Sequence, residues 1–456
     1  MKVHFIAIGG SAMHNLAIAL HQKGINVSGS DDEIFDPARS RLQQHGLLPP
    51  AEGWHPERIT PDLDAIVLGM HAHKDNPELL RAQELGLKIY SYPEYLYEQS
   101  KDKLRIVVGG SHGKTTTTAI ILHVLQHCGI EADFMVGAQL KGFDVMVRLS
   151  NTAKIMVIEG DEYLTSPIDR RPKFHLYHPN VAIVTGIEWD HINVFPTFDI
   201  YRDQFARFVQ LIEPSACSAY PVPPTLIYCN EDPNVRLVAQ EGRHQGLVQL
   251  PYSCPDHRVE GGTTWLGNTP LRVFGHHNLL NLEAARLACR QVGVTDELFM
   301  QAVSNFEGAA KRLELVHHKA DCALYKDFAH APSKLRATIQ AMRQQYPERQ
   351  LVACIELHTY SSLSQQFLDQ YRHTMDLAHT ALVYYSHHAL QLKNLPPLYP
   401  EQVRQAFGGN VEVFTDSSAL VARLRQMGWH NANLLMMSSG NFDGIDFDRL
   451  AEELGI

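Results

Sequence analysis

Residues 104–118, LRIVVGGSHGKTTTT, constrain the fold of this chain more than any other stretch. Residues 104–108 are apolar and β-rich, which predicts a buried strand, and a helix is expected from Lys114 to about His127. Glycines between a strand and a helix let successive backbone N–H groups turn inward, and the helix start adds the positive end of its dipole. We therefore expect an anion site at residues 109–115, which we call the phosphate loop.

The residue types in the phosphate loop indicate a nucleotide. Lys114 is expected to contact terminal phosphates, and the Thr115 hydroxyl is expected to bind Mg²⁺. The match to G-x-x-x-x-G-K-[ST] is incomplete, because Val108 stands where the first glycine belongs. An ordinary glycine turn with a surface lysine is the alternative.

Composition narrows the class of protein. A chain of 456 residues predicts about three domains. The net charge of -10 argues against nucleic acid as a partner, and no apolar run approaches the length of a membrane span or a signal peptide. Seven widely spaced cysteines without a C-x-x-C pair predict reduced, mostly buried thiols. We expect a cytoplasmic protein that is a monomer or a weak homodimer.

The first hundred residues open like a nucleotide-binding domain. A strand at residues 3–8 leads through Gly9 and Gly10 into a helix at residues 13–23, and a second strand at residues 26–28 is followed by Asp31. This order is Rossmann-like and suits a diphosphate at the helix start, with Asp31 near a ribose or base. The third glycine of G-x-G-x-x-G is absent, so a structural turn is the alternative.

A third strand, residues 65–68, runs into a polar loop that contains His71 and Asn76. Folds of this kind place ligands at the carboxyl ends of their strands. The simpler interpretation of Asn76 and Pro77 is a helix start, with asparagine as the cap and proline at the first position. The two interpretations are compatible.

The middle of the chain places acids beside the phosphate loop. Strands are expected at residues 155–158, 181–185 and 226–228, in a parallel sheet covered on both faces. The first ends in Glu159, and the second is followed by an acid and a histidine, Asp190 and His191. Each cluster alone is compatible with plain loop chemistry, but together they favour a site for two cations.

The last third of the chain reads as another α/β unit. A hairpin is expected within residues 248–273 and a helix at residues 282–291, which Asn278 or Asn281 could cap. Beyond a boundary near residue 309, strands are expected, with helices between them, at residues 323–325, 351–355, 381–385, 411–414 and 433–437. The whole chain is therefore predicted to be α/β.

Six motifs, in this order, resemble the Mur ligases, the ATP-dependent amide-forming family of peptidoglycan synthesis. They are Gly9-Gly10, Asp75-Asn76-Pro77-Glu78, Gly110-Ser111-His112-Gly113-Lys114-Thr115, Glu159-Gly160-Asp161-Glu162, His277-Asn278 with Asn281, and Arg312 followed by Asp327-Phe328-Ala329-His330. The resemblance implies a Rossmann-like UDP-sugar domain (residues 1–100), a central P-loop ATPase domain with a parallel sheet (residues 101–309) and a Rossmann-like C-terminal acceptor-binding domain (residues 310–456).

The resemblance also implies roles for individual residues. The implied catalytic residues are Lys114, Glu159 and His191, and the implied Mg²⁺ ligands are Thr115, Glu159 and His191. The implied ATP-binding residues are Gly110, Ser111, His112, Gly113, Lys114, Thr115, Thr116, Asn278, Asn281, Arg312, Asp327 and His330. The implied UDP-sugar-binding residues are Gly9, Gly10, Ser11, Ala12, Met13, Ser30, Asp31, His71, Asn76 and Glu78.

Within the family, SGSD at residues 28–31 and DNPE at residues 75–78 resemble the branch that takes UDP-N-acetylmuramate. One kind of member adds L-alanine, and another adds recycled L-alanyl-γ-D-glutamyl-meso-diaminopimelate. Residues 161–163 and 169–177 resemble the second kind more closely, as does Phe328-Ala329-His330. We expect the peptide ligase of peptidoglycan recycling, with the L-alanine ligase as the alternative.

The chain departs from the family pattern in three places. Lys326 stands in place of the first acid of a pair, and Ala331 replaces a histidine. Residues 201–209 contain no lysine, although other branches carry a carbamylated lysine in this region. Residues 356–360 lack the arginine that the resemblance leads us to expect in this loop.

Two other classes of protein compete with the ligase. An NAD-dependent oxidoreductase would explain the N-terminal fold, but it would leave Lys114 and the neighbouring acids unexplained. A nucleotide switch, or an ATP-driven assembly factor, would turn over ATP independently of an amine or a UDP-sugar.

Overall fold

The chain forms two compact units. The structure is a computed structural model that describes residues 1–138, 140, 142–143, 145–189, 194–309 and 312–456. One unit comprises Met1–Ser253 with Leu280–Val303, and the other comprises Cys254–Leu279 with Ser304–Ile456. None of the helices within the described residues is long and apolar enough to cross a membrane.

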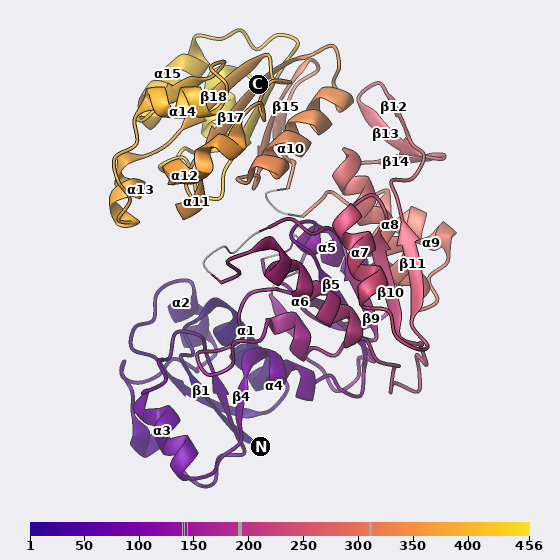
Figure 1. The fold of residues 1–456 in the computed structure, drawn as a ribbon, viewed down its shortest axis with the longest axis vertical. Helices are drawn as coiled ribbons and strands as arrows, with labels where there is room; N and C mark the ends of the chain where they lie inside the picture. The colour runs from indigo at the N-terminus through magenta and orange to yellow at the C-terminus, as the bar shows by residue number, and fades with distance from the viewer. Residues whose placement is uncertain (139, 141, 144, 190–193, 310–311) are drawn as a thin grey trace. The chain divides into compact units, whose positions relative to one another are not determined.

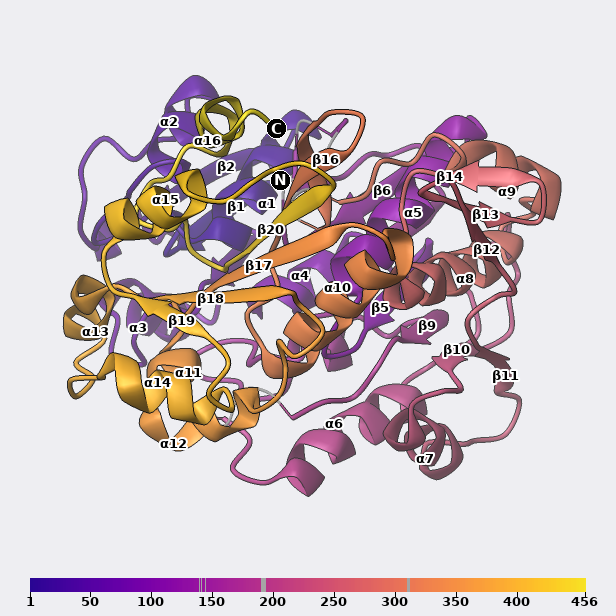
Figure 2. The same cartoon turned by 90° about the horizontal axis from the view of Figure 1, so that it is seen from above.

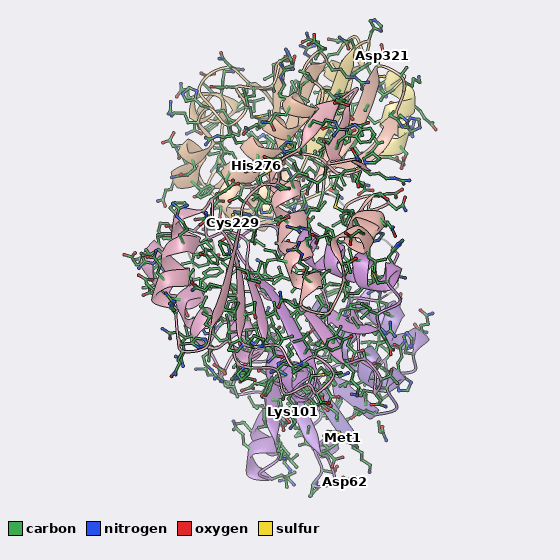
Figure 3. The ribbon with its side chains drawn as sticks, turned by 90° about the vertical axis from the view of Figure 1, so that its right-hand side faces the viewer. Met1, Asp62, Lys101, Cys229, His276 and Asp321 are labelled. Carbon is green, nitrogen blue, oxygen red and sulfur yellow. The ribbon has the colours of Figure 1, made fainter. Side chains whose placement is uncertain are left out.

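The first unit begins with a four-stranded parallel sheet in the order β2-β1-β3-β4. Because β2 and β3 lie on opposite sides of β1, the loops after β1 and β3 meet at a topological switch point, where such sheets bind ligands. At the opposite edge of the sheet, Lys2 Nζ lies 2.5 Å from Asp62 Oδ2, and Met1 and Asp62 lie together there (Figure 3). The elements are β1 (Lys2–Ile6), α1 (Ser11–Gln22), β2 (Asn26–Ser30), α2 (Ala38–Gln44), η1 (Pro56–Arg58), β3 (Ala65–Leu68), α3 (Pro77–Glu84), β4 (Ile89–Ser91) and α4 (Tyr92–Glu98).

A seven-stranded sheet completes the first unit, in the order β11-β10-β9-β5-β8-β6-β7, with only β7 antiparallel to its neighbour. Figure 1 labels β5, β9, β10 and β11 of this sheet. The central strand β5 lies between β8 and β9, so the segments that follow these three strands share one edge of the sheet. The strands are β5 (Leu104–Gly109), β6 (Ala132–Met135), β7 (Val147–Arg148), β8 (Ile155–Glu159), β9 (Val181–Val184), β10 (Thr225–Cys229) and β11 (Val248–Tyr252). The helices are α5 (Lys114–His127), η2 (Lys173–Leu176), α6 (Phe198–Gln210), α7 (Pro233–Glu241), α9 (Asp296–Val303) and, from Leu280 onward, α8 (His276–Arg290).

One hydrophobic core runs through both sheets of the first unit. It contains Val3 and Phe5 from β1, Val107 from β5, and Tyr201 and Phe205 from α6. Burial of apolar surface of this extent is the main stabilising contribution to such a unit. The two sheets are therefore packed together rather than joined by a solvated linker.

The second unit has a six-stranded sheet in the order β15-β16-β20-β17-β18-β19, in which only β15 is antiparallel (Figure 2). Helices α10 and α14 contribute to the core on one face, and α15 and α16 to the core on the other. A separate antiparallel sheet is formed by β12 (Arg258–Glu260), β13 (Thr263–Leu266) and β14 (Thr269–Leu271). The other elements are β15 (Glu314–His318), β16 (Cys322–Asp327), α10 (Pro332–Gln345), β17 (Gln350–Glu356), α11 (Tyr360–Leu363), α12 (Gln365–Leu368), η3 (Asp369–Tyr371), β18 (Thr380–Tyr384), α13 (His387–Leu392), α14 (Pro400–Ala406), β19 (Glu412–Phe414), α15 (Ser417–Arg425), β20 (Ala432–Met437) and α16 (Phe447–Leu454).

Most of the predicted elements are present, with one correction. Helix α8 begins at His276 rather than near residue 282, so Asn278 and Asn281 lie inside the helix and do not cap it. The hairpin predicted within residues 248–273 is confirmed by the antiparallel pairs β12–β13 and β13–β14, and β11 from the same region joins the central sheet. The predicted cap of α3 is confirmed, because the Asn76 side chain accepts hydrogen bonds from the N–H groups of Glu78 and Leu79. The cysteines form no disulfide, as expected.

Arg105 holds together the segment that joins the two sheets of the first unit. Its side chain, on β5, is almost completely buried. One guanidinium nitrogen donates to the carbonyl oxygens of Ser100, Lys101 and Lys103 at 3.0–3.2 Å. The Nε atom donates to Tyr177 and His178, the remaining nitrogen pairs with Glu213, and the guanidinium lies over the Tyr97 ring. A single side chain therefore hydrogen-bonds carbonyl groups from two loops.

We predict that Arg105→Met lowers the free energy of unfolding of the first unit by roughly 3 kcal/mol, because buried carbonyl groups lose their donor. Thermal unfolding followed by calorimetry measures this change. Arg449→Met is the matched control, because Arg449 is 77% exposed and pairs with Glu453 one helical turn away. An Arg105 variant as stable as the control would contradict the role of Arg105.

Candidate active site

The phosphate loop connects β5 to α5, as the sequence predicts. Gly110 and Gly113 have φ angles of 136° and 79°, in the region that favours glycine. A Cβ atom at Gly113 would collide with the Asn281 side chain, and one at Gly110 would collide with Thr185. The loop is therefore closely fitted against β9 and α8, and only glycine suits these two positions.

Lys114, the first residue of α5, is held inside the loop. Its Nζ atom donates to Glu162 Oε2 at 2.7 Å and to the Gly110 carbonyl at 2.5 Å. Burial alone lowers the pKa of Lys114, but the carboxylates of Glu162, Asp161 and Glu159 outweigh burial and raise it. The ammonium group therefore stays charged at neutral pH and faces a set of acids.

Thr115 and Glu159 form the second polar pair of the site. Thr115 Oγ1 donates to Glu159 Oε1 at 2.8 Å, and Glu159 Oε2 accepts from the Gly137 N–H at 2.9 Å. Glu159 is the last residue of β8, so its position follows from the sheet order. A hydroxyl and a carboxylate oxygen thus lie side by side next to Lys114.

The remaining loop residues have mainly internal partners. Ser111 Oγ donates to the Glu188 carbonyl at 2.8 Å and lies 2.8 Å from Tyr201 Oη. A side chain at Gly186 would collide with the His112 ring, so His112 packs closely against the segment after β9. Thr116 is buried in the first turn of α5.

The predicted adenine contacts, Asn278 and Asn281, lie three residues apart on α8. Asn281 accepts a hydrogen bond from Thr117 Oγ1 at 3.3 Å, which places it beside the phosphate loop. Asn278, three residues earlier on α8, donates to the Phe274 carbonyl at 2.9 Å and belongs to the second unit.

Arg312, Asp327 and His330 lie together in the second unit. The Arg312 guanidinium lies 4.9 Å from the centre of the Phe328 ring. Asp327 accepts from the N–H groups of Leu313 at 2.6 Å and Ala329 at 2.7 Å, and burial raises the pKa of its carboxyl group. His330 Nδ1 lies 2.8 Å from the Phe328 carbonyl. Asp327 therefore shapes the loop that carries His330.

At the N-terminal switch point, Gly10 precedes α1, and Ser11 and Ala12 at the helix start are exposed, whereas Met13 is buried. Asp31 Oδ2 accepts the Gly9 N–H at 2.7 Å. Burial, together with the neighbouring Asp32, raises the pKa of Asp31 to about 6. The Asp31 carboxyl group therefore gains or loses its proton near pH 6, a pH at which few carboxyl groups titrate.

The other predicted sugar-site residues differ in exposure. His71 is exposed and lies next to Gly10, whose added Cβ would be 3.5 Å from His71 Nδ1. Glu78 is completely buried and accepts from the His55 N–H at 2.7 Å, with His4 Nε2 at 3.3 Å. Burial opposes its ionisation, but the hydrogen bonds from His4 and from the His55 N–H lower the pKa of Glu78. Glu78, like Asn76 and the buried Ser30, is placed to shape the loops rather than to line an open surface.

Comparisons with known proteins cover nearly the whole chain. The "Mur ligase family, catalytic domain" model matches residues 2–103, the "Mur ligase middle domain" model matches residues 108–289, and the "Mur ligase, glutamate ligase domain" model matches residues 311–440. The UDP-N-acetylmuramate--L-alanine ligase of Syntrophomonas wolfei subsp. wolfei is 30% identical over 377 residues, which are 79% of this chain and 77% of that protein. The chain belongs to the Mur ligase family.

Two further similarities span this Mur ligase from end to end. The Escherichia coli (strain K12) UDP-N-acetylmuramate--L-alanyl-gamma-D-glutamyl-meso-2,6-diaminoheptandioate ligase is 26% identical, covering 98% of this chain and 96% of that protein. A solved structure of the murein peptide ligase of Psychrobacter arcticus 273-4 is 24% identical, with a TM-score of 0.60, and covers 100% of this chain and 99% of that chain. The similarity to this solved structure shows that the two proteins share a fold. The predicted α/β class, with three Mur ligase domains, is confirmed.

Membership makes the protein an ATP-dependent ligase of peptidoglycan synthesis, and Mur ligases use ATP and Mg²⁺. The described residues fit both. The glycine loop offers its backbone and the Lys114 ammonium group as contacts for phosphates. The Thr115 hydroxyl and the Glu159 carboxylate are oxygen ligands of the kind that Mg²⁺ prefers. Among the described residues no group of three or more histidine, cysteine or acidic side chains forms a metal site by itself. The predicted ligand His191 lies outside the described residues.

The sequence left two residues of this site without a role. Glu162 was part of a recognised motif, but its ion pair with Lys114 spans 48 residues and depends on the pairing of β5 with β8. Tyr201 gave no local signal at all, because its neighbours on α6 are ordinary core residues.

We predict that the affinity of this Mur ligase for UDP-N-acetylmuramate depends on pH through Asp31. An ionised carboxylate accepts a stronger hydrogen bond from a nucleotide hydroxyl than a protonated carboxyl group does, so affinity should rise between pH 5 and pH 7, through the Asp31 pKa of about 6. Calorimetric titration should show an increase of about three- to tenfold in wild type and a much smaller one in Asp31→Asn.

The matched control is Glu84→Gln, which changes a carboxylate that is 66% exposed and should keep the wild-type pH dependence. A wild-type affinity that does not change between pH 5 and pH 7 would exclude Asp31 from nucleotide binding.

Proposed function

We propose that this Mur ligase joins the carboxylate of UDP-N-acetylmuramate to the amine of L-alanyl-γ-D-glutamyl-meso-diaminopimelate and converts ATP to ADP and phosphate. The observation that carries the ligase chemistry is the pairing of Lys114 with Glu162 and of Thr115 with Glu159 around one glycine loop. This reaction would serve the recycling of peptidoglycan peptides.

The chemistry accounts for a site with so many charges. A carboxylate is a poor electrophile, so one of its oxygens attacks the γ-phosphorus of ATP, the bond to ADP breaks, and an acyl phosphate forms. The amine then attacks the acyl carbon, the C–O bond breaks, and phosphate leaves. Both first reactants are anionic, so Lys114 and the backbone N–H groups at the start of α5 would screen their repulsion. Bound Mg²⁺, held by Thr115 and Glu159, would supply further positive charge.

The UDP part of the sugar nucleotide is assigned to the N-terminal switch point. Gly10 and Ser11 offer backbone N–H groups at the start of α1, which suit a diphosphate, and the Gly9 N–H is taken by Asp31. Asp31 and His71 flank this turn, Asp31 directly after β2 and His71 in the loop after β3. Asn76 and Glu78 would act indirectly, by holding the loop that carries His71.

The proposed division of labour follows the three domains. Residues 1–100 would bind the UDP-sugar, residues 101–309 would bind ATP and carry the chemistry, and residues 310–456 would present the acceptor. Arg312, Asp327 and His330 would reach the nucleotide from the third domain. His191 would complete the second Mg²⁺ site with Glu159.

The choice of a tripeptide acceptor is supported by the segment after β8. Residues 161–163 and 169–177 resemble the peptide-adding members, and the Escherichia coli relative that adds this tripeptide aligns over 98% of the chain. In the structure, Arg171 pairs with Asp169 at 2.6 Å and with Glu94 at 3.3 Å, so the segment is tied to the start of α4. This fixed segment lines a cavity of about 370 Å³ with Ser91 and Leu68.

L-alanine is the second candidate acceptor. It is favoured by the Syntrophomonas wolfei relative and by a Limosilactobacillus reuteri relative that is 29% identical over 96% of this chain, both of which are named L-alanine ligases. The two candidates differ only in the acceptor, so one assay separates them.

The test measures phosphate release and product mass with ATP, UDP-N-acetylmuramate and one acceptor at a time: L-alanine, L-alanyl-γ-D-glutamate or the tripeptide. We expect release only with sugar and acceptor together, and a kcat/KM for the tripeptide at least about tenfold above that for L-alanine, equivalent to about 1.4 kcal/mol. Equal or better use of L-alanine would overturn the tripeptide assignment, and undiminished release without the sugar would overturn the donor assignment.

A further inference from the structure

Tyr201 lies in the first turns of α6 and directs its hydroxyl into the phosphate loop. The ring is completely buried, and its Oη atom lies 2.8 Å from Ser111 Oγ and donates to Glu162 Oε1 at 3.2 Å. We propose that Tyr201 is a positioning residue, whose hydroxyl links the phosphate loop to the carboxylate that holds Lys114.

The first partner, Ser111, is fixed from two directions. The Glu188 N–H donates to Ser111 Oγ at 2.9 Å, and Ser111 Oγ donates to the Glu188 carbonyl at 2.8 Å. Each hydroxyl carries one proton, and Tyr201 gives its own to Glu162, so the Ser111 proton goes either to the Glu188 carbonyl or to Tyr201 Oη. Tyr201 therefore joins a serine that already ties the phosphate loop to the segment after β9.

The second partner, Glu162, is 2% exposed and divides its two oxygens between Lys114 and Tyr201. Under the proposed function, on which this inference rests, Lys114 must turn from Glu162 to phosphate oxygens when ATP binds. A buried carboxylate that loses its cation is costly unless hydrogen bonds remain. The Tyr201 hydroxyl stays beside Glu162 in both states, so it lowers the free-energy cost of releasing Lys114.

The position of the hydroxyl is set by packing and not by the loop. The Tyr201 ring packs against Phe205 at 5.3 Å and Phe195 at 5.4 Å between ring centres. Helix α6 is capped by Thr197, whose side chain accepts the Ile200 N–H at 3.3 Å. Because α6 contributes to the same core as β5 and β8, the hydroxyl is held in place before any ligand arrives.

A purely structural tyrosine is the competing explanation, and the chain contains a control for it. Tyr252, at the end of β11, is also buried in the first unit, but its hydroxyl has no hydrogen-bond partner among the described residues. Tyr201→Phe and Tyr252→Phe remove the same atom from two buried rings. Any difference between the two variants therefore reports the hydrogen bonds of Tyr201.

The experiment measures the affinity of the full-length protein for a non-hydrolysable ATP analogue with Mg²⁺, by calorimetry, together with the affinity for UDP-N-acetylmuramate and the thermal midpoint. We expect Tyr201→Phe to weaken binding of the analogue about tenfold, as for loss of one hydrogen bond to a charged group. Its affinity for the UDP-sugar should not change, and Tyr252→Phe should match wild type in both titrations.

A double-mutant cycle with Glu162→Gln tests whether Tyr201 acts through Glu162. If it does, Tyr201→Phe should have little further effect on analogue binding in the Glu162→Gln background. Unchanged binding of the analogue in the single variant, an equal loss in both backgrounds, or an equal loss for the two ligands would each overturn the proposal. No turnover is needed, so these results stand apart from the choice of acceptor and from the test of the proposed reaction.

Discussion

The ion pair between Lys114 and Glu162 is the interaction on which the candidate site depends. An ammonium group in a glycine loop must be paired, because burying an isolated charge is costly. Glu162 supplies the pairing, and Asp161 and Glu159 add to the negative potential, so the pKa of Lys114 is raised although burial opposes ionisation. The same excess of acid favours cations, and phosphate oxygens can replace Glu162 as the partner of Lys114. A site with this balance is prepared for a nucleotide and its metal ions.

Close packing around the phosphate loop makes the site a property of the whole first unit. Thr185 follows β9, Asn281 lies on α8, and both leave no space for a side chain on the adjacent glycines. Tyr201 reaches the loop from α6, and Glu159 from the end of β8. The loop conformation is therefore specified by four elements outside the loop, and the hydrophobic core that holds them fixes the relative positions of the charged groups.

The sequence predicted the elements and the loop well, because strong local signals specify them. The pattern correctly places the β-rich strand before Gly109, the glycines and the helix from Lys114 to His127. The Asn76 cap was also predicted correctly. The start of α8 was misplaced because asparagines resemble caps, whereas Asn281 is held inside the helix beside Gly113 by tertiary contacts. Tyr201 and the partner of Lys114 could not be found, since both depend on contacts across 39 or more residues. His191, predicted from its place after β9, remains a prediction.

In the proposed reaction, the sugar carboxylate is activated by transfer of the γ-phosphoryl group of ATP within the phosphate loop. The most direct measurement uses UDP-N-acetylmuramate labelled with ¹⁸O in both oxygens of its carboxylate and analyses the released phosphate by mass spectrometry. If an acyl phosphate forms, each phosphate carries one ¹⁸O atom, and the new amide keeps the other. Release of phosphate without label, while the amide product accumulates, would contradict the account.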